Sequence, residues 1–375
     1  MRVVVTGQVG LDKQHFLERM AQIAADQHRE LTLCHVGQMM YAEAPDVGAG
    51  RILDLPLSRL TGLRRSVFKD VSAVCERSAD VIINTHATFR WRHGLFYAFD
   101  YDLMRLINAD LYVVLVDNID RVHYRLRRDG HTDHTLKDLM VWREEEMLAT
   151  ELLAQICRGH GCFYIAGRGD DSEPSSCAAA LANLILRPRA KKAYLSFPMS
   201  HVHADRAGAA LLAEIETFRR EMKRHVTCFD PGDVEEKPLC SLALEAARQG
   251  RRLVEFGPPG RKAVMETSQL VDIIADIDGQ IYARDFKLID QSDMILSLVP
   301  ALADGRPALS SGVERELQHA HEATKEVFVI WRPAAEPSPF VTETATRVFK
   351  SVAEAVAFFL ENHYISPGLA GGLFG

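Results

Sequence analysis

The sequence has few cysteines, and they are not placed as a disulfide framework or a zinc site would need them. It contains seven, an odd number, and no two of them form a CxxC pair. This pattern predicts thiols that stay reduced in a cytoplasmic protein, and it predicts no bound metal.

Long apolar runs and an excess of positive charge are also missing. No stretch approaches the roughly 18 uninterrupted apolar residues of a membrane span, and residues 1–5 are expected to form a strand rather than a leader. The formal net charge of -7 gives no general attraction to duplex nucleic acid or anionic lipid. We therefore expect a cytoplasmic protein without a membrane or duplex partner, whose ligands are small phosphorylated molecules bound by local basic clusters.

What the chain does contain is enough apolar sequence for two cores. Its 375 residues are 47% apolar and 25% charged, which is the balance of a globular protein with two domains. Short β-branched runs alternate with longer amphipathic stretches, a pattern typical of parallel sheets with crossover helices. A polar, proline-bearing stretch at 187–192 separates two such series. The sequence thus predicts an α/β fold of two doubly wound parallel-sheet domains in series, over residues 1–189 and 190–375.

The predicted elements divide between these two domains. The first sheet is expected to contain strands at 2–6, 31–36, 80–84, 111–116 and 162–165, closed by a helix over 175–186. The second is expected to contain strands at 193–197, 226–229, 294–299 and 327–331, with helices over 207–224, 276–291 and 312–324. The segment GPPGRK at 257–262 is predicted to be a flexible loop inside the second sheet, where it could border a site.

The segment TGQVGLDKQ, at 6–14, has the position of a phosphate loop between the first strand and the first helix. In such a loop, glycines let backbone N–H groups surround a phosphate, a lysine reaches the outer phosphates, and a Ser or Thr hydroxyl binds magnesium. Gly7, Gly10 and Lys13 fit this pattern. Asp12 replaces the glycine that normally precedes the lysine, and Gln14 replaces the Ser or Thr that binds magnesium. We therefore predict weak nucleotide binding with weak or no magnesium dependence.

Three further blocks support a nucleotide site in the first domain. They are HVGQMM at 35–40, NTHA at 84–87 and an arginine-rich helix over 119–128. With the altered loop, these blocks resemble the archaeal-type adenylate kinases and related small nucleotide kinases over nearly all of 1–189. The resemblance implies a P-loop kinase fold and a nucleotide ligand such as ATP. Its site residues beyond the loop would be Thr85, His86, Arg125 and Arg128.

At four positions the sequence differs from the pattern of these kinases. Gln38 and Asn84 stand where the family carries carboxylates, and Asp12 and Gln14 alter the loop. Because phosphoryl transfer depends on positioning and on neutralising charge, these changes leave three possibilities open. The domain transfers phosphate with an atypical loop, binds nucleotide without turnover, or is a structural relic whose arginines form a solvated helix face.

The second domain carries a glutamate on the first turn of a predicted helix. Glu316 lies four residues after Gly312, and a Ser-Ser-Gly turn opens the helix. Such a residue on its own is usually only a favourable partner of the helix dipole. The segments 194–198 and 282–293 are also expected at the carboxyl edge of the sheet, where open α/β sheets bind ligands.

Together, YLSFP at 194–198, RD at 284–285 with IDQSD at 289–293, and GVERE at 312–316 resemble the nucleoside 2-deoxyribosyltransferase superfamily over roughly 192–335. The resemblance implies that Glu316 is the nucleophile on the anomeric carbon and that Asp285 holds sugar hydroxyls or assists the leaving base. The chemistry is that of a covalent glycosyl-enzyme and requires no cofactor. The implied substrate-binding residues are Tyr194, Ser196, Pro198, Asp293, Ser311 and Gly312, although Asp293 also fits a capping or solvated role.

The leading hypothesis is an enzyme that cleaves or transfers the N-glycosidic bond of a nucleoside, nucleotide or NAD-like molecule, with the phosphate-loop domain binding nucleotide. One alternative is a small nucleotide kinase with an atypical phosphate loop. Another is a non-catalytic nucleotide-sensing effector subunit. A homo-oligomer is expected, whereas the choice between hydrolase and transferase stays open.

Overall fold

The computed structural model describes residues 1–91, 94–131, 133–169, 177–199 and 208–365. Its contacts group the chain into two compact units. The first comprises 1–171 and 233–281, and the second comprises 172–232 and 282–375. We call 233–281 the insertion segment, because it interrupts the second unit in sequence and packs with the first. The predicted division at residue 190 stays a prediction.

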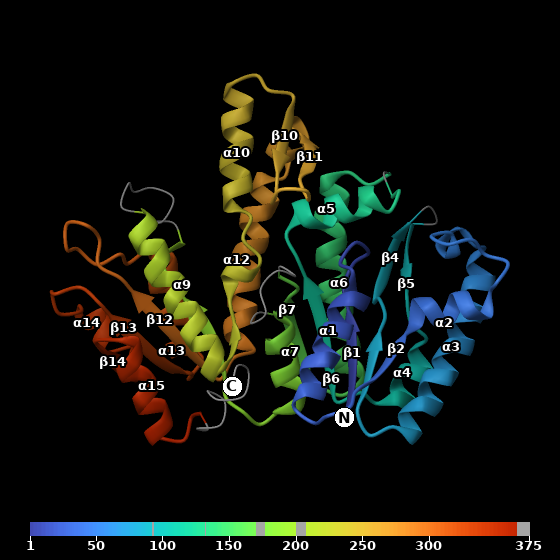
Figure 1. Cartoon of the computed structure of the whole chain (residues 1–375), viewed down its shortest axis with the longest axis horizontal. Helices are drawn as coiled ribbons and strands as arrows, with labels where there is room; N and C mark the ends of the chain where they lie inside the picture. The colour runs from blue at the N-terminus through green and yellow to red at the C-terminus, as the bar shows by residue number, and fades with distance from the viewer. Residues whose placement is uncertain (92–93, 132, 170–176, 200–207, 366–375) are drawn as a thin grey trace. The chain divides into compact units, whose positions relative to one another are not determined.

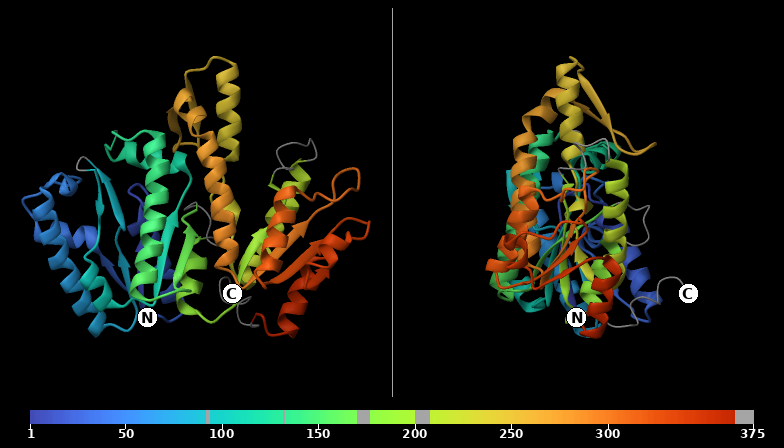
Figure 2. Two further views of the ribbon diagram at one scale, coloured as in Figure 1. Left: turned by 180° about the vertical axis from the view of Figure 1, so that it is seen from behind. Right: turned by 90° about the vertical axis from the view of Figure 1, so that its left-hand side faces the viewer.

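The first unit is built on a five-stranded parallel sheet with the order β2-β3-β1-β6-β7. Helices α1 and α6 cover opposite faces of this sheet (Figures 1 and 2). With both faces covered, the central strand is an apolar run, and Val3, Val4 and Val5 are fully buried. All five predicted strands are present, as β1 (Arg2–Thr6), β2 (Thr32–His35), β3 (Val81–Asn84), β6 (Leu111–Val116) and β7 (Phe163–Gly167).

Helices and one hairpin complete this part of the first unit. The helices are α1 (Lys13–Asp26), α2 (Val36–Glu43), α3 (Leu57–Arg77), α4 (Tyr101–Ile107), α5 (Ile119–Arg128) and α6 (Leu136–Cys157), with a 3₁₀ turn, η1 (Ile52–Asp54). Two short antiparallel strands, β4 (Thr88–Trp91) and β5 (Gly94–Tyr97), were not predicted. Their residues are mostly not buried, so neither strand is marked by the buried apolar run of a central sheet strand.

The insertion segment corrects one prediction. It contains α10 (Lys237–Arg248), β10 (Leu253–Phe256), β11 (Ala263–Glu266), α11 (Thr267–Asp272) and the start of α12 (Ile274–Asp290). The loop 257–262 was expected inside a parallel sheet, but it is the turn of the antiparallel hairpin β10–β11. Gly257 has φ +123, and a Cβ there would lie 2.7 Å from the Arg261 carbonyl oxygen, so this tight turn requires glycine.

The second unit is built on another five-stranded parallel sheet, with the order β14-β13-β12-β8-β9. Read from β9 to β14 and numbered within the unit, this is the 2-1-3-4-5 order of doubly wound folds, in which the order of strand addition reverses between β8 and β12. The strands are β8 (Lys192–Ser196), β9 (Thr227–Phe229), β12 (Met294–Val299), β13 (Glu326–Trp331) and β14 (Arg347–Phe349). The predicted fold class, two parallel α/β sheets in series, is therefore confirmed.

Helices cover both faces of the second sheet. The aromatic side chains of Phe218 on α9 and Phe359 on α15 are fully buried in one core with alternate residues of β8 and β12. Helix α13 packs against β12 and β13 through Val313, Leu317 and Ala320. The helices are α7 (Cys177–Leu186), α9 (Gly208–His225), α13 (Ser311–Glu322), α14 (Pro339–Thr342) and α15 (Val352–Glu361), with a 3₁₀ turn, η2 (Pro231–Asp233), at the unit boundary.

Across the described ranges, no helix has both the length and the apolar character needed to span a bilayer.

Candidate functional site

The phosphate-loop segment folds tightly between β1 and α1. Gly7 and Gly10 have φ values of +138 and +91. A Cβ at Gly7 would lie 2.5 Å from Leu11 Cδ1 and 2.8 Å from the Leu115 carbonyl oxygen, so both conformation and space require glycine there. The two glycines found in the sequence therefore shape the loop at the point where α1 begins.

Lys13 is the first residue of α1, and its side chain turns back into the loop. It is only 7% exposed, and Nζ donates a hydrogen bond to the Gly7 carbonyl oxygen at 2.6 Å. The two ring nitrogens of His86 lie 3.2 and 3.3 Å from Nζ. The structure thus brings together three of the residues that were predicted to bind nucleotide.

Burial changes the titration of both cationic candidates. Loss of solvent lowers the pKa of Lys13 to about 7, although the nearby Glu146 carboxylate raises it in part. Burial, and then the Lys13 charge, lower the pKa of His86 well below its ordinary value. At neutral pH a neutral imidazole therefore faces a lysine that is only partly protonated, and a bound anion would favour its charged form.

Nucleotide affinity should accordingly depend on pH above neutrality. A phosphate beside Nζ raises the pKa of bound Lys13 above the free value of about 7. The binding energy is therefore fully present below about pH 7 and is lost as pH rises toward the bound pKa, by up to about tenfold in affinity per pH unit. Calorimetry with ATP from pH 7.5 to 9.5, where the phosphates are fully ionised, measures this decline. Lys13→Arg should give a flat profile, and a flat wild-type profile would contradict the assignment.

Glu146, on α6, organises the loop and was missed by the sequence analysis. Its carboxylate is 1% exposed and accepts hydrogen bonds from the backbone N–H groups of Gly7 (2.9 Å), Ala87 (2.8 Å) and Thr88 (2.8 Å). The Thr88 hydroxyl adds a fourth, at 2.8 Å. Glu146 therefore ties the phosphate loop to the block that follows β3, where Thr85 and His86 lie.

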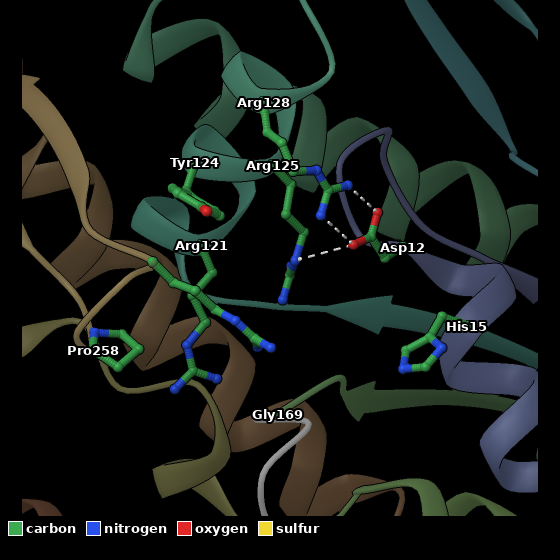
Figure 3. A pocket seen from close by; sticks show the side chains of 9 residues that line it. Asp12, His15, Arg121, Tyr124, Arg125, Arg128, Gly169 and Pro258 are labelled. Atoms are coloured by element: carbon green, nitrogen blue, oxygen red, sulfur yellow. Dashed lines mark hydrogen bonds and ion pairs between the residues drawn. The ribbon is translucent and has the colours of Figure 1, made fainter.

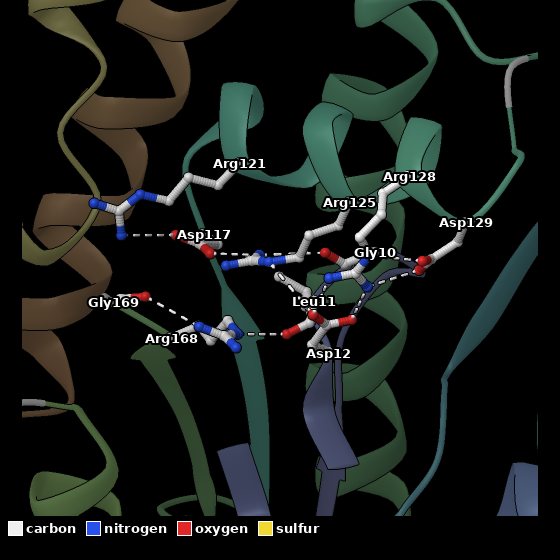
Figure 4. Close-up of polar contacts among 10 residues, drawn as sticks. All are labelled: Gly10, Leu11, Asp12, Asp117, Arg121, Arg125, Arg128, Asp129, Arg168 and Gly169. Carbon is white, nitrogen blue, oxygen red and sulfur yellow. Dashed lines mark hydrogen bonds and ion pairs between the residues drawn. The ribbon is translucent and has the colours of Figure 1, made fainter. Parts of the chain in front are cut away.

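Two arginines of α5 lie beside the phosphate loop, where they are paired with carboxylates. Asp12 has a left-handed backbone (φ 47), and its two oxygens lie 3.0 and 3.2 Å from the Arg128 guanidinium. Arg125 Nε lies 3.8 Å from Asp12, while its Nη1 donates to Asp117 at 2.7 Å and to Gly10 O at 3.2 Å (Figure 4). Asp12 is thus an ion-pair partner of Arg128 within the loop, whereas Arg125 pairs chiefly with Asp117.

The donor atoms near the loop do not fit a magnesium ion. Gln38 donates to the Gln14 amide oxygen at 2.7 Å, and Asn84 Nδ2 lies 2.9 Å from His35 Nδ1. Magnesium prefers carboxylate and phosphate oxygens in octahedral geometry, whereas these amides are neutral and already paired with each other or with imidazole. The part of the chain that the structure describes also holds no group of three or more His, Cys, Asp or Glu residues suited to a metal. We therefore derive no metal-dependent step at this site.

Two cavities of the first unit meet at the phosphate loop. The loop pocket, of about 360 Å³, is lined by Lys13 and His86 together with apolar side chains such as Met40, Phe89 and Trp91. The arginine pocket, of about 330 Å³, is lined by side chains of α5 and shares Asp12 with the loop pocket (Figure 3). Both volumes are within the range of small-ligand sites.

In the second unit, Glu316 is held by two buried hydroxyl groups. The Tyr194 hydroxyl donates to Oε1 at 3.0 Å and the Ser196 hydroxyl donates to Oε2 at 2.6 Å. Ser297 on β12 in turn lies 3.4 Å, oxygen to oxygen, from Ser196 on β8. This cluster therefore lies where the strand order reverses, which is the position at which doubly wound sheets bind ligands.

The surroundings of Glu316 favour its protonated form. Burial, and then the charge of Asp285, raise its pKa to about 8, against the lowering effect of the hydrogen bonds from Ser196 and Tyr194. Burial and the neighbouring Glu316 also raise the pKa of Tyr194 well above its ordinary value. The tyrosine thus stays a hydrogen-bond donor when Glu316 ionises.

The structure brings only some of the other predicted residues to this cluster. Asp285, on α12, lies near enough to act on the charge of Glu316, and its Oδ1 is 3.7 Å from Arg284 Nε. Pro198 is buried directly after β8, whereas Ser311 and Gly312 are exposed on the first turn of α13. Ser310, the first residue of the Ser-Ser-Gly turn, caps α13 by accepting a hydrogen bond from Val313 N at 3.2 Å.

Asp293 lies apart from this cluster. Its Oδ2 accepts a hydrogen bond from Lys192 N at 2.8 Å, at the amino ends of β8 and β12. Glu314 is exposed on α13 and, two residues before Glu316, projects from a different face of the helix. A substrate contact by Asp293 stays a prediction that this position does not favour.

Comparison with known proteins identifies a relative of the N-terminal half. No family model matches the chain. The chain is 22% identical over 174 residues to an adenylate kinase of Pyrococcus abyssi, a match that covers 45% of this chain and 87% of that protein. The N-terminal half therefore resembles an adenylate kinase P-loop domain, which indicates a nucleotide-related function.

Two solved structures resemble the chain weakly. One is a shikimate kinase from Bacteroides thetaiotaomicron (TM-score 0.35, 15% identity), over 50% of this chain and 98% of its own. The other is a phosphoglycerate kinase from Coxiella burnetii (TM-score 0.18, 12% identity), over 98% and 94%. TM-scores this low do not establish a common fold. None of these matches supports the deoxyribosyltransferase resemblance of the second domain.

Proposed function

We propose that the first unit is a nucleotide-binding unit of the small-nucleotide-kinase type that binds phosphate through protein cations rather than through magnesium. The observation that carries this proposal is Lys13, buried at the start of α1 against Gly7 and His86, with a pKa of about 7. A lysine that is desolvated at a loop of this shape is costly for stability and is suited to an incoming anion. The similarity to an adenylate kinase supports a nucleotide as that anion.

The altered loop residues favour binding over efficient turnover. Phosphoryl transfer needs charge neutralisation at the transferred group, which kinases supply with magnesium and arginines together. Here Gln14 and Gln38 are hydrogen-bonded to each other, and Arg128 is paired with Asp12. We therefore expect nucleotide binding with phosphoryl transfer that is slow even at saturating ATP.

Restoring the two altered loop residues should strengthen ATP binding through separable effects. Asp12→Gly suits the left-handed backbone and removes one of the two carboxylates paired with Arg128, the other being Asp129, so we expect a gain of roughly tenfold in affinity without magnesium. Gln14→Thr, added to it, should introduce a magnesium-dependent gain. Calorimetry with and without magnesium measures both.

A matched control for Asp12→Gly is Asp26→Asn, which removes the same charge at the far end of α1. It should leave the affinity unchanged. Wild-type binding that is tight and strictly magnesium-dependent would contradict the proposal, and no gain in either loop variant would mean that the loop is a structural relic.

A second candidate function is N-glycosidic bond cleavage or transfer by the second unit. The observation that favours it is the pair of hydroxyl donors, Tyr194 and Ser196, that hold the Glu316 carboxyl at the strand reversal of the sheet. In the ionised form, Glu316 would attack the anomeric carbon of a nucleoside or nucleotide and displace the base, and water or a second base would then release the sugar. Asp285 would hold sugar hydroxyls or assist the leaving base.

The experiment that separates these functions is incubation of the full chain with a panel of nucleosides, nucleotides and NAD. Chromatography detects free base, and labelled ATP detects phosphoryl transfer. Base release supports the glycosidic function, and phosphate transfer supports a working kinase. Binding with neither product would indicate a nucleotide-sensing subunit.

A further inference from the structure

The outer side of α6 exposes a stripe of large apolar side chains. Leu148, Leu152 and Ile156 are 57%, 47% and 58% exposed. Residues four positions apart lie on the same side of a helix, so these three follow one another along α6. In the left view of Figure 2, α6 lies in front of the first sheet with the β4–β5 hairpin beside it.

The β4–β5 hairpin continues this apolar surface to one side of α6. The Thr88 hydroxyl on β4 donates to Glu146 of α6 at 2.8 Å, so this face of the hairpin is on the α6 side. Tyr97 is the partner of Thr88 across the hairpin and therefore lies on the same face, 70% exposed. Leu95, two residues earlier on the same strand, shares that face and is 54% exposed.

Helix α4 continues the surface near the carboxyl end of α6. Arg158 directly follows α6 and donates to Asn108 at 3.3 Å and to Asp110 at 3.1 Å, at the end of α4. The ends of these two helices are therefore side by side. Tyr101 lies about two turns before Asn108 on the same side of α4, and it is 41% exposed.

These side chains form an apolar surface that is large for a protein without a partner. We call it the α6 surface, and it consists of Leu95, Tyr97, Tyr101, Leu148, Leu152 and Ile156. Together they expose roughly 600 Å², at the upper limit of the apolar patches found on typical monomers. Two such surfaces in contact would bury about 1,200 Å², which is the size at which specific, stable interfaces begin.

The charged residues around the α6 surface do not call for a partner of one sign. On the edge toward β4, Arg90 Nε donates to Glu145 at 2.9 Å, and Arg158 is paired as described above. On α4, Asp102 and Arg105 are both exposed and contribute one charge of each sign. The surface is therefore matched by another apolar surface rather than by a strongly charged ligand.

From these observations we infer that two copies of the chain associate through the α6 surface in a two-fold symmetric interface. A second copy presents an apolar surface of the same size, and a closed two-fold pair is the commonest arrangement of soluble oligomers. The inference concerns assembly and is independent of the proposed nucleotide binding.

The test is sedimentation velocity of the purified full chain over a concentration range from about 1 to 100 µM, in which a dimer with micromolar affinity dissociates on dilution. Leu152→Glu places a carboxylate from each copy in the apolar contact, so self-association should weaken at least about a hundredfold. Tyr97→Ser removes an aromatic side chain on a different element of the surface and should weaken it about tenfold or more.

The matched control is Leu244→Glu, the same change at a leucine of the insertion segment that is 46% exposed on α10, outside the α6 surface. It should leave the dimer intact. All three replaced side chains are exposed, so circular dichroism and the melting temperature of the monomer are expected to show unchanged folding.

Three results would overturn the inference. The wild-type chain could stay monomeric at the highest concentration, in which case the α6 surface is covered by something other than a second copy. A dimer could form that neither Leu152→Glu nor Tyr97→Ser weakens, or Leu244→Glu could weaken it equally. ATP binding, measured on the same variants, is expected to be unchanged, so failure of the dimer and failure of the proposed nucleotide binding are distinguishable.

Discussion

Glu316→Gln is expected to lower base release by roughly a thousandfold or more on any substrate that the wild-type chain cleaves. The substitution keeps the shape of the side chain and one of the two oxygens that accept from Tyr194 and Ser196, and its NH₂ group can donate to the other hydroxyl, but it removes the charge that attacks the anomeric carbon. Because the attacking form is the carboxylate and its pKa is about 8, wild-type base release should rise with pH up to about that value. Chromatography of free base from pH 6 to 9 measures both effects.

The matched control is Glu314→Gln on the same helix. Glu314 is exposed and, two residues earlier, points about 200° away from Glu316, so the rate should stay within a few-fold of wild type. Mass spectrometry with a 2-fluoro sugar analogue should find the sugar on Glu316 alone. The mechanism would be contradicted if Glu316→Gln released base at the wild-type rate, or if the sugar adduct were found on Glu314 or Asp285.

The same variant makes an independent prediction about stability. A carboxyl whose folded pKa is raised from its ordinary 4.5 to about 8 stabilises the fold below pH 4.5, and this contribution is lost as pH rises toward 8. Glu316→Gln has no such loss. The difference in melting temperature between the variant and the wild type should therefore grow in favour of the variant from pH 5 to 8 and stay constant above pH 8. A gain in stability together with a loss of activity is typical of a functional group held in an unfavourable environment.

The fold was predictable where its pattern is local and repeated. All five strands of the first sheet and four of the second appear as β-branched or apolar runs of three to six residues separated by amphipathic helices. Strands β4, β5 and β14 are as short as some of the predicted strands, but most of their residues are not buried, so no continuous run of buried apolar residues marks them in the sequence. The association of 233–281 with the first unit depends on contacts such as Glu236 with Arg143, 93 residues apart, and no local pattern encodes them.

The candidate sites divide in the same way. Gly7, Gly10 and Lys13 were predictable because a phosphate loop places its residues within a few positions along the chain. The pairing of Asp12 with Arg128 and the contact of Glu316 with Tyr194 join residues 116 and 122 positions apart. The sequence indicated that each of these residues was unusual, but only the fold shows that Asp12 faces the arginines.

Glu146 is the clearest case of a site residue that sequence alone does not reveal, and its replacement has the largest expected effect on the first unit. In Glu146→Gln, one carboxylate oxygen becomes an NH₂ group that faces the backbone N–H donors of Gly7 and Ala87 or that of Thr88. Buried donors then lose their acceptor, so the free energy of unfolding should fall by about 2–4 kcal/mol. The loop and the block carrying His86 lose their common anchor, and ATP affinity should fall at least about tenfold.

Tryptophan fluorescence can follow this change in the first unit alone. Trp142 is fully buried and donates to the Thr88 carbonyl oxygen at 3.4 Å, so it reports on the segment that Glu146 holds. A Trp331→Phe background removes the one tryptophan of the second unit from the signal during denaturant unfolding. Glu145→Gln breaks the partly exposed pair with Arg90 and should cost at most about 1 kcal/mol, with unchanged ATP affinity. If Glu146→Gln unfolds and binds ATP as Glu145→Gln does, Glu146 does not organise the phosphate loop, and the desolvated Lys13 beside it would need another explanation.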